Sequence, residues 1–535
     1  MNIKSNGVFL TVLYALIILT GFFITWDFTA DDSYITFRYS KHLADGLGLV
    51  FNPGDSNPVE GYTNFLWMII MAIPHFLGWS PIIFSKIFGL LCFSGCALSL
   101  NRYVSYKTGS STWGYLAIIP FIILPSTYFH SISGMETILY DFILLLVFIS
   151  GYEIITTREK PAGWQIAVAP ILVLLVGMTR PEGLLPGLIM LLTIYYVTDK
   201  NDRKRLLIYS LFLLFFPGLV YFIWRVIYFG WLLPNTFYVK FGQPFDGIEW
   251  LAISIGSLAG IIVVIYMAYA LTRNHGQKKL VVPLYYVSFL ITAILAYCGS
   301  NLMMNYMNRF LFHVLPVIFL IFTLEMHALF CRSDNNKTGK SASYGLIIII
   351  VIICLFPLFH KDKTETAHMA LYESHLKNAH INLAYSLKKI NIPKELKRLA
   401  VGDAGAIPYY SEWVSYDFVG LNDEFAAHNP SDKSDYIMEK KPSLLILYSG
   451  DGININSYQF GFEPHSQLSQ YDEIGFIKWF PDYYLAVYLR NDIDSLYYNA
   501  VAEVVRGIQQ EAQYLNADAD NRAGLVKHLK TRIGL

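Results

Sequence analysis

The chain has 535 residues, of which 54% are hydrophobic, 16% aromatic and only 15% charged. Soluble globular domains have fewer apolar and more charged residues, so this composition excludes an ordinary soluble protein and predicts one that crosses a membrane several times. The 40 basic and 40 acidic side chains balance, so the overall charge gives no indication of a nucleic-acid partner.

Long apolar segments divide the first two thirds of the chain. A helix needs about 20 mostly apolar residues to span a bilayer. Eleven segments approach this length: 7–27, 82–100, 113–129, 137–155, 164–180, 183–198, 206–229, 248–271, 280–298, 309–331 and 343–359. Phe28 directly follows the first segment, at a position where a signal peptidase requires a small residue, so we expect a retained transmembrane helix. A further stretch, 64–78, is shorter and contains Pro74 and His75.

The distribution of Lys and Arg predicts the orientation. If 64–78 lies in the membrane interface and does not cross, the basic clusters at 102–107, 158–160, 200–205, 273–279 and 332–340 fall on the same side as Lys4. The opposite loops hold only Arg38, Lys41, Arg180, Lys240 and Arg309. The positive-inside rule then places the N-terminus in the cytoplasm. Because eleven is an odd number of crossings, the C-terminal segment and the loop after the first helix lie together on the periplasmic side.

From about residue 360 the composition turns polar. Short apolar strands are predicted at 399–402, 444–448 and 484–489, and helices at 370–390 and 496–515, which together indicate an α/β domain. We therefore expect a polytopic α-helical membrane domain over 1–359, with a first periplasmic loop and juxtamembrane helices over 26–81. A soluble periplasmic α/β domain follows over 360–535.

The periplasmic loops carry most of the unusual polar residues. Asp31 and Asp32 follow the first helix directly. Later loops add Glu60; His130 and Glu136; Arg180 and Glu182; Asn235, Tyr238 and Lys240; and Asn305, Arg309 and His313. Ionisable groups close to the membrane are costly and usually face a polar cavity. Several loops that supply such groups to one face therefore predict a functional site there.

This set of residues suits the transfer of a sugar from a polyprenyl phosphate to a hydroxyl group. A carboxylate must take the proton of the attacking hydroxyl, a role for Asp31 or Asp32. Cations must stabilise the charge that builds on the departing phosphate, a role for Arg180, Lys240 and Arg309. The expected donor side also includes Asn235, Tyr238 and His313, and the expected acceptor side includes Glu60, Asp403 and Asp423.

Each of these residues also has a structural interpretation. Adjacent aspartates often cap a helix, Glu136 could cap the helix expected from residue 137, and Arg309 could anchor a helix end. The Gly-Asp-Ala-Gly sequence around Asp403 could be a tight turn after a strand. Neighbouring carboxylates repel, so one of Asp31 and Asp32 could instead have a raised pKa or bind a divalent cation. The functional interpretation therefore depends on the convergence of several loops.

Several segments resemble a known family. They are DDSYITFRYSKHLADGLGLVFNPG and VEGYTNFLW, then SGMET, RPEG, LPNTFYVK, RFL followed by LP, and GDAGAIPYYS with DFVGLND. They resemble GT-C glycosyltransferases similar to the mycobacterial terminal arabinofuranosyltransferase. The resemblance implies a GT-C fold whose first outer loop holds the catalytic acid, at Asp31 and Asp32, and whose second acidic residue matches Glu136. It also implies a decaprenyl or undecaprenyl phosphate sugar donor and inversion at the anomeric carbon.

We therefore expect a glycosyltransferase of the bacterial inner membrane. It would move a sugar, with a pentose such as arabinofuranose favoured, from a polyprenyl phosphate to a periplasmic or cell-surface glycan or glycoprotein. The lipid bilayer is its other partner, and no nucleic acid is expected. No metal ligand or cofactor is assigned, with a divalent cation as an open alternative. Two other functions stay open: an O-antigen-ligase-type glycan transferase and a non-enzymatic transporter of lipid-linked glycans.

Overall fold

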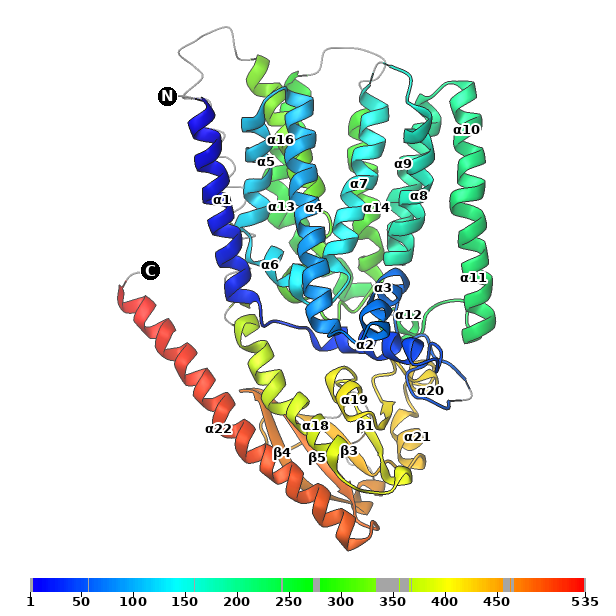
Figure 1. Ribbon diagram of the computed structural model, residues 1–535, viewed down its shortest axis with the longest axis vertical. Helices are drawn as coiled ribbons and strands as arrows, with labels where there is room; N and C mark the ends of the chain where they lie inside the picture. The colour runs from blue at the N-terminus through cyan, green and yellow to red at the C-terminus, as the bar shows by residue number, and fades with distance from the viewer. Residues whose placement is uncertain are drawn as a thin grey trace.

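The computed structural model describes residues 3–55, 57–157, 159–241, 244–272, 280–332, 356, 365–366, 368–455, 462 and 466–533. A bundle of long helices is joined to a smaller unit that contains a five-stranded sheet (Figure 1). The N-terminal helix starts at the end of the bundle far from the sheet, and the C-terminal helix lies along the sheet (Figure 1). We call the bundle end nearest the sheet unit the lower end.

The apolar segments form the helices of the bundle. The uninterrupted ones are α1 (Ile3–Thr25), α4 (Pro81–Thr108), α7 (Thr137–Thr156), α8 (Gly163–Thr179), α9 (Leu184–Val197), α13 (Pro244–Thr272), α14 (Val281–Leu295) and α16 (Leu315–Arg332). A continuous stretch runs from α10 (Lys200–Ser210) through the π-helical residues Leu211–Phe215 into α11 (Phe216–Phe229).

One further helical stretch of the bundle is bent, and a second bend precedes α16. α5 (Ser111–Ile123) meets α6 (Pro125–Ile132) at 73°, and 306–312 meets 315–331 at 58°. The first bend precedes Pro125, which has no backbone N–H and suits only the first turn of a helix. α6 lies near the lower end of the bundle (Figure 1).

The predicted spans can be compared with these helices. The segments from 7–27 to 309–331 each fall on a helix or a bent pair, while 343–359 lies outside the described residues except for residue 356. By length and hydropathy, four of the described helices can cross a membrane alone, or six if each bent pair is one span. Eleven crossings therefore stay a prediction.

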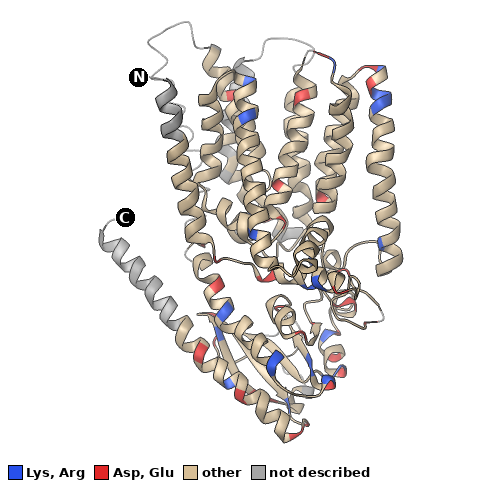
Figure 2. Ribbon diagram, in the orientation of Figure 1, with Lys and Arg blue, Asp and Glu red and all other residues tan. Residues whose placement is uncertain are grey.

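The outer surface of the bundle is apolar. Phe23 is 87% exposed, Ile227 79% and Leu192 64%, which would be unfavourable in water and suits contact with lipid. Charged residues gather at the two ends of the bundle and over the sheet unit, with few along the middle (Figure 2). The fold is that of a membrane protein.

Short elements close the lower end of the bundle. They are α2 (Asp31–Ala44), α3 (Phe65–Phe76), η1 (Pro181–Gly183), α12 (Asn235–Lys240) and α15 (Arg309–Phe312). α3 covers most of the stretch 64–78, and its 12 residues rise about 18 Å, less than the roughly 30 Å of the hydrocarbon core. α2 packs against α3 on one side and α19 (Ala406–Ser411) on the other. This position puts the first turn of α2 between the bundle and the sheet unit.

The sheet unit has a mixed sheet in the order β2-β1-β3-β5-β4. The strands are β1 (Arg398–Val401), β2 (Val414–Asp417), β3 (Leu444–Ser449), β4 (Tyr471–Phe480) and β5 (Tyr483–Arg490). β1 is parallel to β2 and β3, whereas β5 is antiparallel to β3 and β4. The predicted strands fall on β1, β3 and β5, and the sequence analysis missed β2 and β4.

Helices surround this sheet. They are η6 (Lys377–Ile381) with α18 (Asn382–Lys389), α20 (Glu424–His428), α21 (Lys433–Glu439) and α22 (Ser495–Ile533). The two helices predicted at 370–390 and 496–515 fall on the first and last of these. α22 packs along β4, and α20 contacts α12 of the bundle. The sheet unit therefore meets the bundle through α19 and α20.

A buried arginine fastens α2 to the sheet unit. Arg38 is 2% exposed, and its guanidinium donates to the carbonyl oxygens of Phe51 (2.6 Å), Trp413 (3.0 Å) and Pro408. It also donates to Asn52 Oδ1 at 3.2 Å. The guanidinium group thus has acceptors in both the first loop and the sheet unit, and these bonds fix α2 in place. They also fix the side chains at the first turn of α2.

Candidate active site

A cavity of about 320 Å³ lies at the lower end of the bundle, between α2, the start of α7, η1, α12 and α15. Its polar lining includes Asp32, Thr36, Asn64, Glu136, Arg180, Glu182, Lys240, Tyr297, Ser300 and Arg309. Apolar residues, among them Ile35, Leu233 and Phe237, complete the wall. Segments that are far apart in the sequence therefore bring three acidic and three basic side chains to one place.

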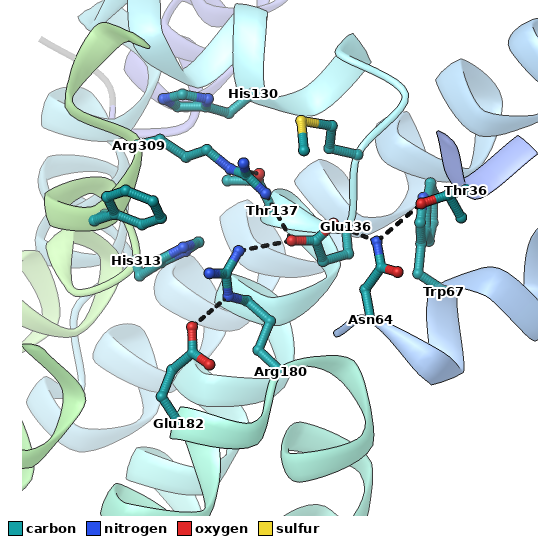
Figure 3. Close-up of polar contacts among 12 residues, drawn as sticks. Thr36, Asn64, Trp67, His130, Glu136, Thr137, Arg180, Glu182, Arg309 and His313 are labelled. Atoms are coloured by element: carbon teal, nitrogen blue, oxygen red, sulfur yellow. Dashed lines mark hydrogen bonds and ion pairs between the residues drawn. The ribbon is translucent and has the colours of Figure 1, made fainter. Parts of the chain in front are cut away.

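Glu136 is the centre of a hydrogen-bonded network in this cavity (Figure 3). Its Oε1 accepts from Arg309 at 2.6 Å and Arg180 at 2.7 Å, and its Oε2 accepts from Asn64 Nδ2 at 2.7 Å. Burial alone would raise the pKa of Glu136, but the two guanidinium groups outweigh it and hold the pKa at about 2. The carboxylate is therefore ionised, and it binds both arginines rather than a ligand.

The two arginines have further partners. Arg180 Nε donates to Glu182 at 2.6 Å, and Tyr297 donates to the same carboxylate oxygen at 2.8 Å. Arg309 Nε donates to Thr137 Oγ1 at 2.9 Å. Arg180 ends α8 and Pro181 starts η1, so the tight turn brings Glu182 back to the guanidinium. The network is a closed group of paired charges.

Asp32 and Lys240 face the same cavity outside this network. Neither side chain makes a hydrogen bond or ion pair with another residue that the structure describes. Burial raises the pKa of Asp32, against the positive charges of Lys240 and Arg309. Burial likewise lowers the pKa of Lys240, against the negative charge of Asp32. These are the two charged groups of the cavity that a ligand can engage without breaking an existing bond.

Asp31 points the other way, into the sheet unit. Its Oδ1 accepts from the backbone N–H of Ala406 at 2.8 Å, and its own N–H donates to Tyr372 Oη at 3.2 Å. Burial raises the pKa of Asp31 to about 7, a shift that His380 opposes and Asp403 reinforces. Consecutive helical residues project about 100° apart, so the two aspartates serve different surfaces.

Asp403 lies at this same junction. His380 Nε2 is 3.0 Å from Asp403 Oδ2, and Tyr483 donates to both carboxylate oxygens at 2.9 and 3.0 Å. Asp403 does not line the cavity. Its partners, including its electrostatic contact with Asp31, place it between α2 and the sheet unit.

Three residues expected on the donor side lie outside the cavity lining. His313 Nδ1 is 2.6 Å from Asp141, with both side chains fully buried. Asn235 Nδ2 donates to the carbonyl oxygens of Gly420 (2.6 Å) and Asp423 (3.0 Å), which joins α12 to the sheet unit. The ring of Tyr238 packs on a histidine of α20 at 4.3 Å. All three hold the walls of the site together.

The remaining residues expected on the acceptor side lie behind and beside the cavity. Glu60 forms an ion pair with Arg225 at 2.6 Å. Asp423 caps α20 by accepting from the backbone N–H of Ala426 at 3.1 Å, and it accepts from Tyr436 at 3.2 Å. Neither lines the cavity.

The sequence analysis missed Asn64, Thr137 and Tyr297, which contact the charged network directly. Asn64 and Thr137 had one usable signal, their places in the VEGYTNFLW and SGMET segments, whereas Tyr297 lies in helical sequence that gives no hint. Among the residues that the structure describes, no group of three or more His, Cys, Asp or Glu could hold a metal ion.

A strained loop leads into Arg309. Leu302, Met304, Met307 and Asn308 have φ values of 52°, 61°, 50° and 51°, in the left-handed region that non-glycine residues rarely adopt. The carbonyl of Met307 is 3.3 Å from His130 Nε2, and its N–H donates to Glu365 at 2.5 Å. Strain of this kind persists only where surrounding contacts enforce it and is typical of functional sites.

Comparison with known proteins gives a sequence match only within the sheet unit. The model of a domain of unknown function, DUF8728, matches residues 372–498. No curated protein matches the sequence.

Solved structures match the fold over nearly the whole chain. The crystal structure of ArnT from Cupriavidus metallidurans bound to undecaprenyl phosphate aligns with a TM-score of 0.54 at 11% identity, covering 92% of this chain and 99% of that one. The apo structure of the same ArnT aligns with a TM-score of 0.52 at 13% identity, covering 91% and 98%. The chain therefore has an ArnT-like GT-C fold, as the sequence resemblance implied. The arabinofuranosyltransferase specificity stays a prediction.

Proposed function

We propose that this protein transfers a sugar from a polyprenyl phosphate to an acceptor hydroxyl, with Asp32 as the general base. The observation that carries the proposal is the pairing pattern of the cavity, where Asp32 and Lys240 alone among its charged residues lack a partner in the described chain. The fold supports the same function, because the ArnT it resembles was crystallised with undecaprenyl phosphate.

The reaction at this site is a displacement at the anomeric carbon. The acceptor oxygen forms a bond to that carbon while the bond from the carbon to the phosphate oxygen breaks. Asp32 takes the hydroxyl proton as the acceptor attacks. Its raised pKa makes it a stronger base than an exposed aspartate. Attack from the face opposite the phosphate inverts the anomeric configuration.

The leaving group is a polyprenyl phosphate, which departs with the electron pair of the broken bond. Lys240 binds its oxygens directly, because this ammonium has no competing carboxylate bonded to it. Arg309 and Arg180 contribute at longer range, since Glu136 already occupies them. In this proposal Glu136 positions the two guanidinium groups and does not itself exchange protons, because its pKa of about 2 keeps it ionised.

The remaining features of the proposed enzyme follow the sequence analysis. The donor sugar is a pentose such as arabinofuranose on a decaprenyl or undecaprenyl phosphate. The protein lies in the bacterial inner membrane with its N-terminus in the cytoplasm, and its site and sheet unit face the periplasm. This orientation is supported by the distribution of Lys and Arg along the sequence.

The test is transfer from synthetic polyprenyl-phosphoryl sugars to membranes of a strain that lacks the gene. Asp32→Asn keeps the shape of the side chain but cannot accept a proton, so it should lower the transfer rate at least a hundredfold. Asp45→Asn is the matched control, because Asp45 is exposed at the far end of the same helix. Its rate should equal that of the wild type.

Two results would count against the proposal. Full activity of Asp32→Asn would show that Asp32 is not the general base. Transfer only from undecaprenyl diphosphate-linked glycans would favour the ligase alternative instead. The anomeric configuration of the product, measured by NMR, tests inversion separately.

A further inference from the structure

A second cavity lies beside the first and has no part in the mechanism above. It measures about 580 Å³. It is bounded by the first loop at Asn52, Asp55, Asn57 and Val59, by Trp231, and by the sheet unit from Tyr416 to Lys440. We call it the side cleft. Its lining is rich in polar side chains, and the proposed reaction leaves it unused.

The side cleft and the catalytic cavity share a wall. A small pocket of about 10 Å³ shares Val59, Trp231 and Glu424 with the side cleft and Leu233 with the catalytic cavity. Asn422 lines the cleft and Gly61 lines the cavity, yet a Cβ atom on that glycine would lie only 2.0 Å from Asn422 Oδ1. A ligand that fills the side cleft as far as Asn422 therefore lies next to the cavity that contains Asp32.

Rigid aromatic rings form part of the side cleft. Trp231 stacks on His428 with ring centres 3.9 Å apart, and its indole N–H donates to Glu424 at 2.9 Å. Phe425 stacks on Tyr436 at 4.3 Å. The outer rings, Trp231 and Phe425, each remain 38% exposed. The negative face of an aromatic ring attracts the polarised C–H groups of a sugar ring, and rings that are already held rigid lose little entropy when they bind.

The polar groups of the side cleft suit hydroxyl groups rather than anions. Three carboxylates (Asp55, Asp423 and Glu424) and four amides line it, against one ammonium, Lys440. This excess of negative charge repels phosphates and acidic sugars. Carboxylates and amides both form hydrogen bonds with neutral polyols.

Two buried polar atoms at this cleft have no partner. Asn422, which is 4% exposed, leaves its Oδ1 without a hydrogen bond, and so does His428 with its Nε2, within the part of the chain that the structure describes. Buried polar atoms are nearly always bonded in folded proteins, and each exception calls for a ligand, water or other explanation. A sugar hydroxyl can donate to the first and bond to the second.

We propose that the side cleft binds a neutral oligosaccharide, and that the acceptor of the proposed transfer is the end of such a glycan chain. The second part depends on the proposed function, because it requires the terminal hydroxyl to reach Asp32. The glycan lies across Trp231 and Phe425, and its end lies at the shared wall beside Asn422.

The binding test uses the full-length protein in detergent without any donor. The probes are neutral hexasaccharides of glucose, mannose, galactose and arabinose, with hexagalacturonate as the acidic counterpart, in isothermal titration. We expect at least one neutral hexasaccharide to bind and hexagalacturonate not to. Phe425→Ala removes an exposed ring and should weaken that binding at least tenfold. Trp231→Phe keeps the stacked ring but loses the N–H, so its effect should be smaller.

Tyr514→Ala is the matched control, because Tyr514 is a 74% exposed aromatic residue on α22, away from the cleft. It should bind like the wild type. Failure of every neutral hexasaccharide to bind, a preference for hexagalacturonate, or unchanged binding by Phe425→Ala would overturn the assignment.

Failure of the cleft can be distinguished from failure of the proposed function. If oligosaccharide binds and Phe425→Ala weakens it, but no polyprenyl-phosphoryl sugar is transferred, the cleft stands and the transferase does not. If transfer occurs and Phe425→Ala leaves the KM for the acceptor membranes unchanged, the transferase stands and the cleft does not. We expect this variant to raise the acceptor KM tenfold while the donor KM stays constant.

Discussion

Lys240 differs from the two arginines of the cavity because no carboxylate is bonded to it. An ammonium that is held in place but unpaired loses nothing when a phosphate arrives, whereas Arg180 and Arg309 must share Glu136 with any new anion. Asp32 and Glu136 differ in the same way, because Asp32 is unpaired in the described chain and Glu136 is bonded to both arginines. At the residue scale, the state of pairing distinguishes the groups that meet the substrate from the groups that position them.

Lys240→Gln should therefore lower activity without lowering stability. A hydrogen bond to a charged group contributes about 1.5–3 kcal/mol, so kcat/KM for the donor should fall roughly ten- to hundredfold. The melting temperature should not fall, because the substitution removes a buried charge. Steady-state kinetics and thermal unfolding in detergent measure both quantities.

Glu136→Gln provides the contrast for that experiment. It leaves two guanidinium groups around a neutral amide, and breaking a buried ion pair in this way costs about 3–5 kcal/mol. This variant should unfold at a clearly lower temperature. Equal melting temperatures of the Glu136 and Lys240 variants would contradict the division between positioning and binding groups.

Asp31 should make stability depend on pH. Its pKa is raised to about 7 in the folded protein, against about 3.9 in an unfolded chain, so between these values the folded state holds a proton that the unfolded state has lost. The contribution of Asp31 to stability is therefore present at pH 4 and decreases as the pH rises to 7. Asp31→Asn keeps an acceptor for the N–H of Ala406 but does not titrate.

The measurement is the melting temperature of both proteins from pH 4 to 8. The wild type should lose stability relative to Asp31→Asn as the pH rises to 7, and the difference should then stay constant. A difference that does not change over this range would show that Asp31 titrates normally.

At the scale of elements, the contact between α2 and the segment before α19 leaves no room for a side chain. A Cβ atom on Gly405 would lie 2.1 Å from the carbonyl oxygen of Asp31 and 2.4 Å from its Oδ2. Both neighbours belong to the first turn of α2, which also holds Asp32. The glycine therefore sets how closely the sheet unit approaches the catalytic helix.

Gly405→Ala should move that first turn and lower the transfer rate more than it lowers protein yield. Gly507→Ala is the matched control, because Gly507 lies within α22 and a Cβ there meets nothing within 4 Å. The control should be neutral or slightly stabilising, by up to about 1 kcal/mol, since alanine favours helix. Equal activity of the two variants would contradict the close approach.

The elements also show what could be predicted from sequence. Apolar runs located the bundle helices, and short apolar runs located β1, β3 and β5. β4 was missed because a register shift between Glu473 and Gly475 interrupts the alternation on which strand prediction depends. β2 was missed because it has only four residues.

The site was predictable only in part for a similar reason. Sequence placed Asp31 and Asp32 in the loop after the first helix but could not distinguish them. The choice depends on Ala406 and Tyr372, which contact Asp31 from more than 300 residues away in the sequence. Most of the cavity's charged residues could be predicted because they lie in loops close to the membrane, where charged side chains are rare. Tyr297 gave no such signal, because tyrosines are common in this chain, with 38 in total.

At the scale of the whole molecule, Arg38 joins the two units. Arg38→Lys keeps the charge but replaces a fork of donors by one nitrogen, so it leaves buried carbonyl oxygens at Trp413 or Phe51 without a donor. Each costs about 1–3 kcal/mol. Hydrogen exchange at residues 403–415 should become faster, and the transfer rate should fall.

Lys41→Arg is the control on the same helix. Lys41 pairs with Glu412 of the same sheet-unit segment, but both side chains are partly exposed, at 29% and 41%. Such pairs contribute at most about 1 kcal/mol, so exchange should not change. Unchanged exchange in Arg38→Lys as well would show that the units are held together by other contacts.

The hydrogen bond between Asp31 and Ala406 spans 375 residues of sequence, and this separation has a consequence for biosynthesis. At 5–20 residues per second, a ribosome needs roughly 20–75 s to make the intervening chain. During that interval α2 has emerged without the segment that orients it. Under the proposed function, a nascent or truncated protein would therefore meet lipid-linked sugars with an unassembled site, and could not consume them before its last domain has folded.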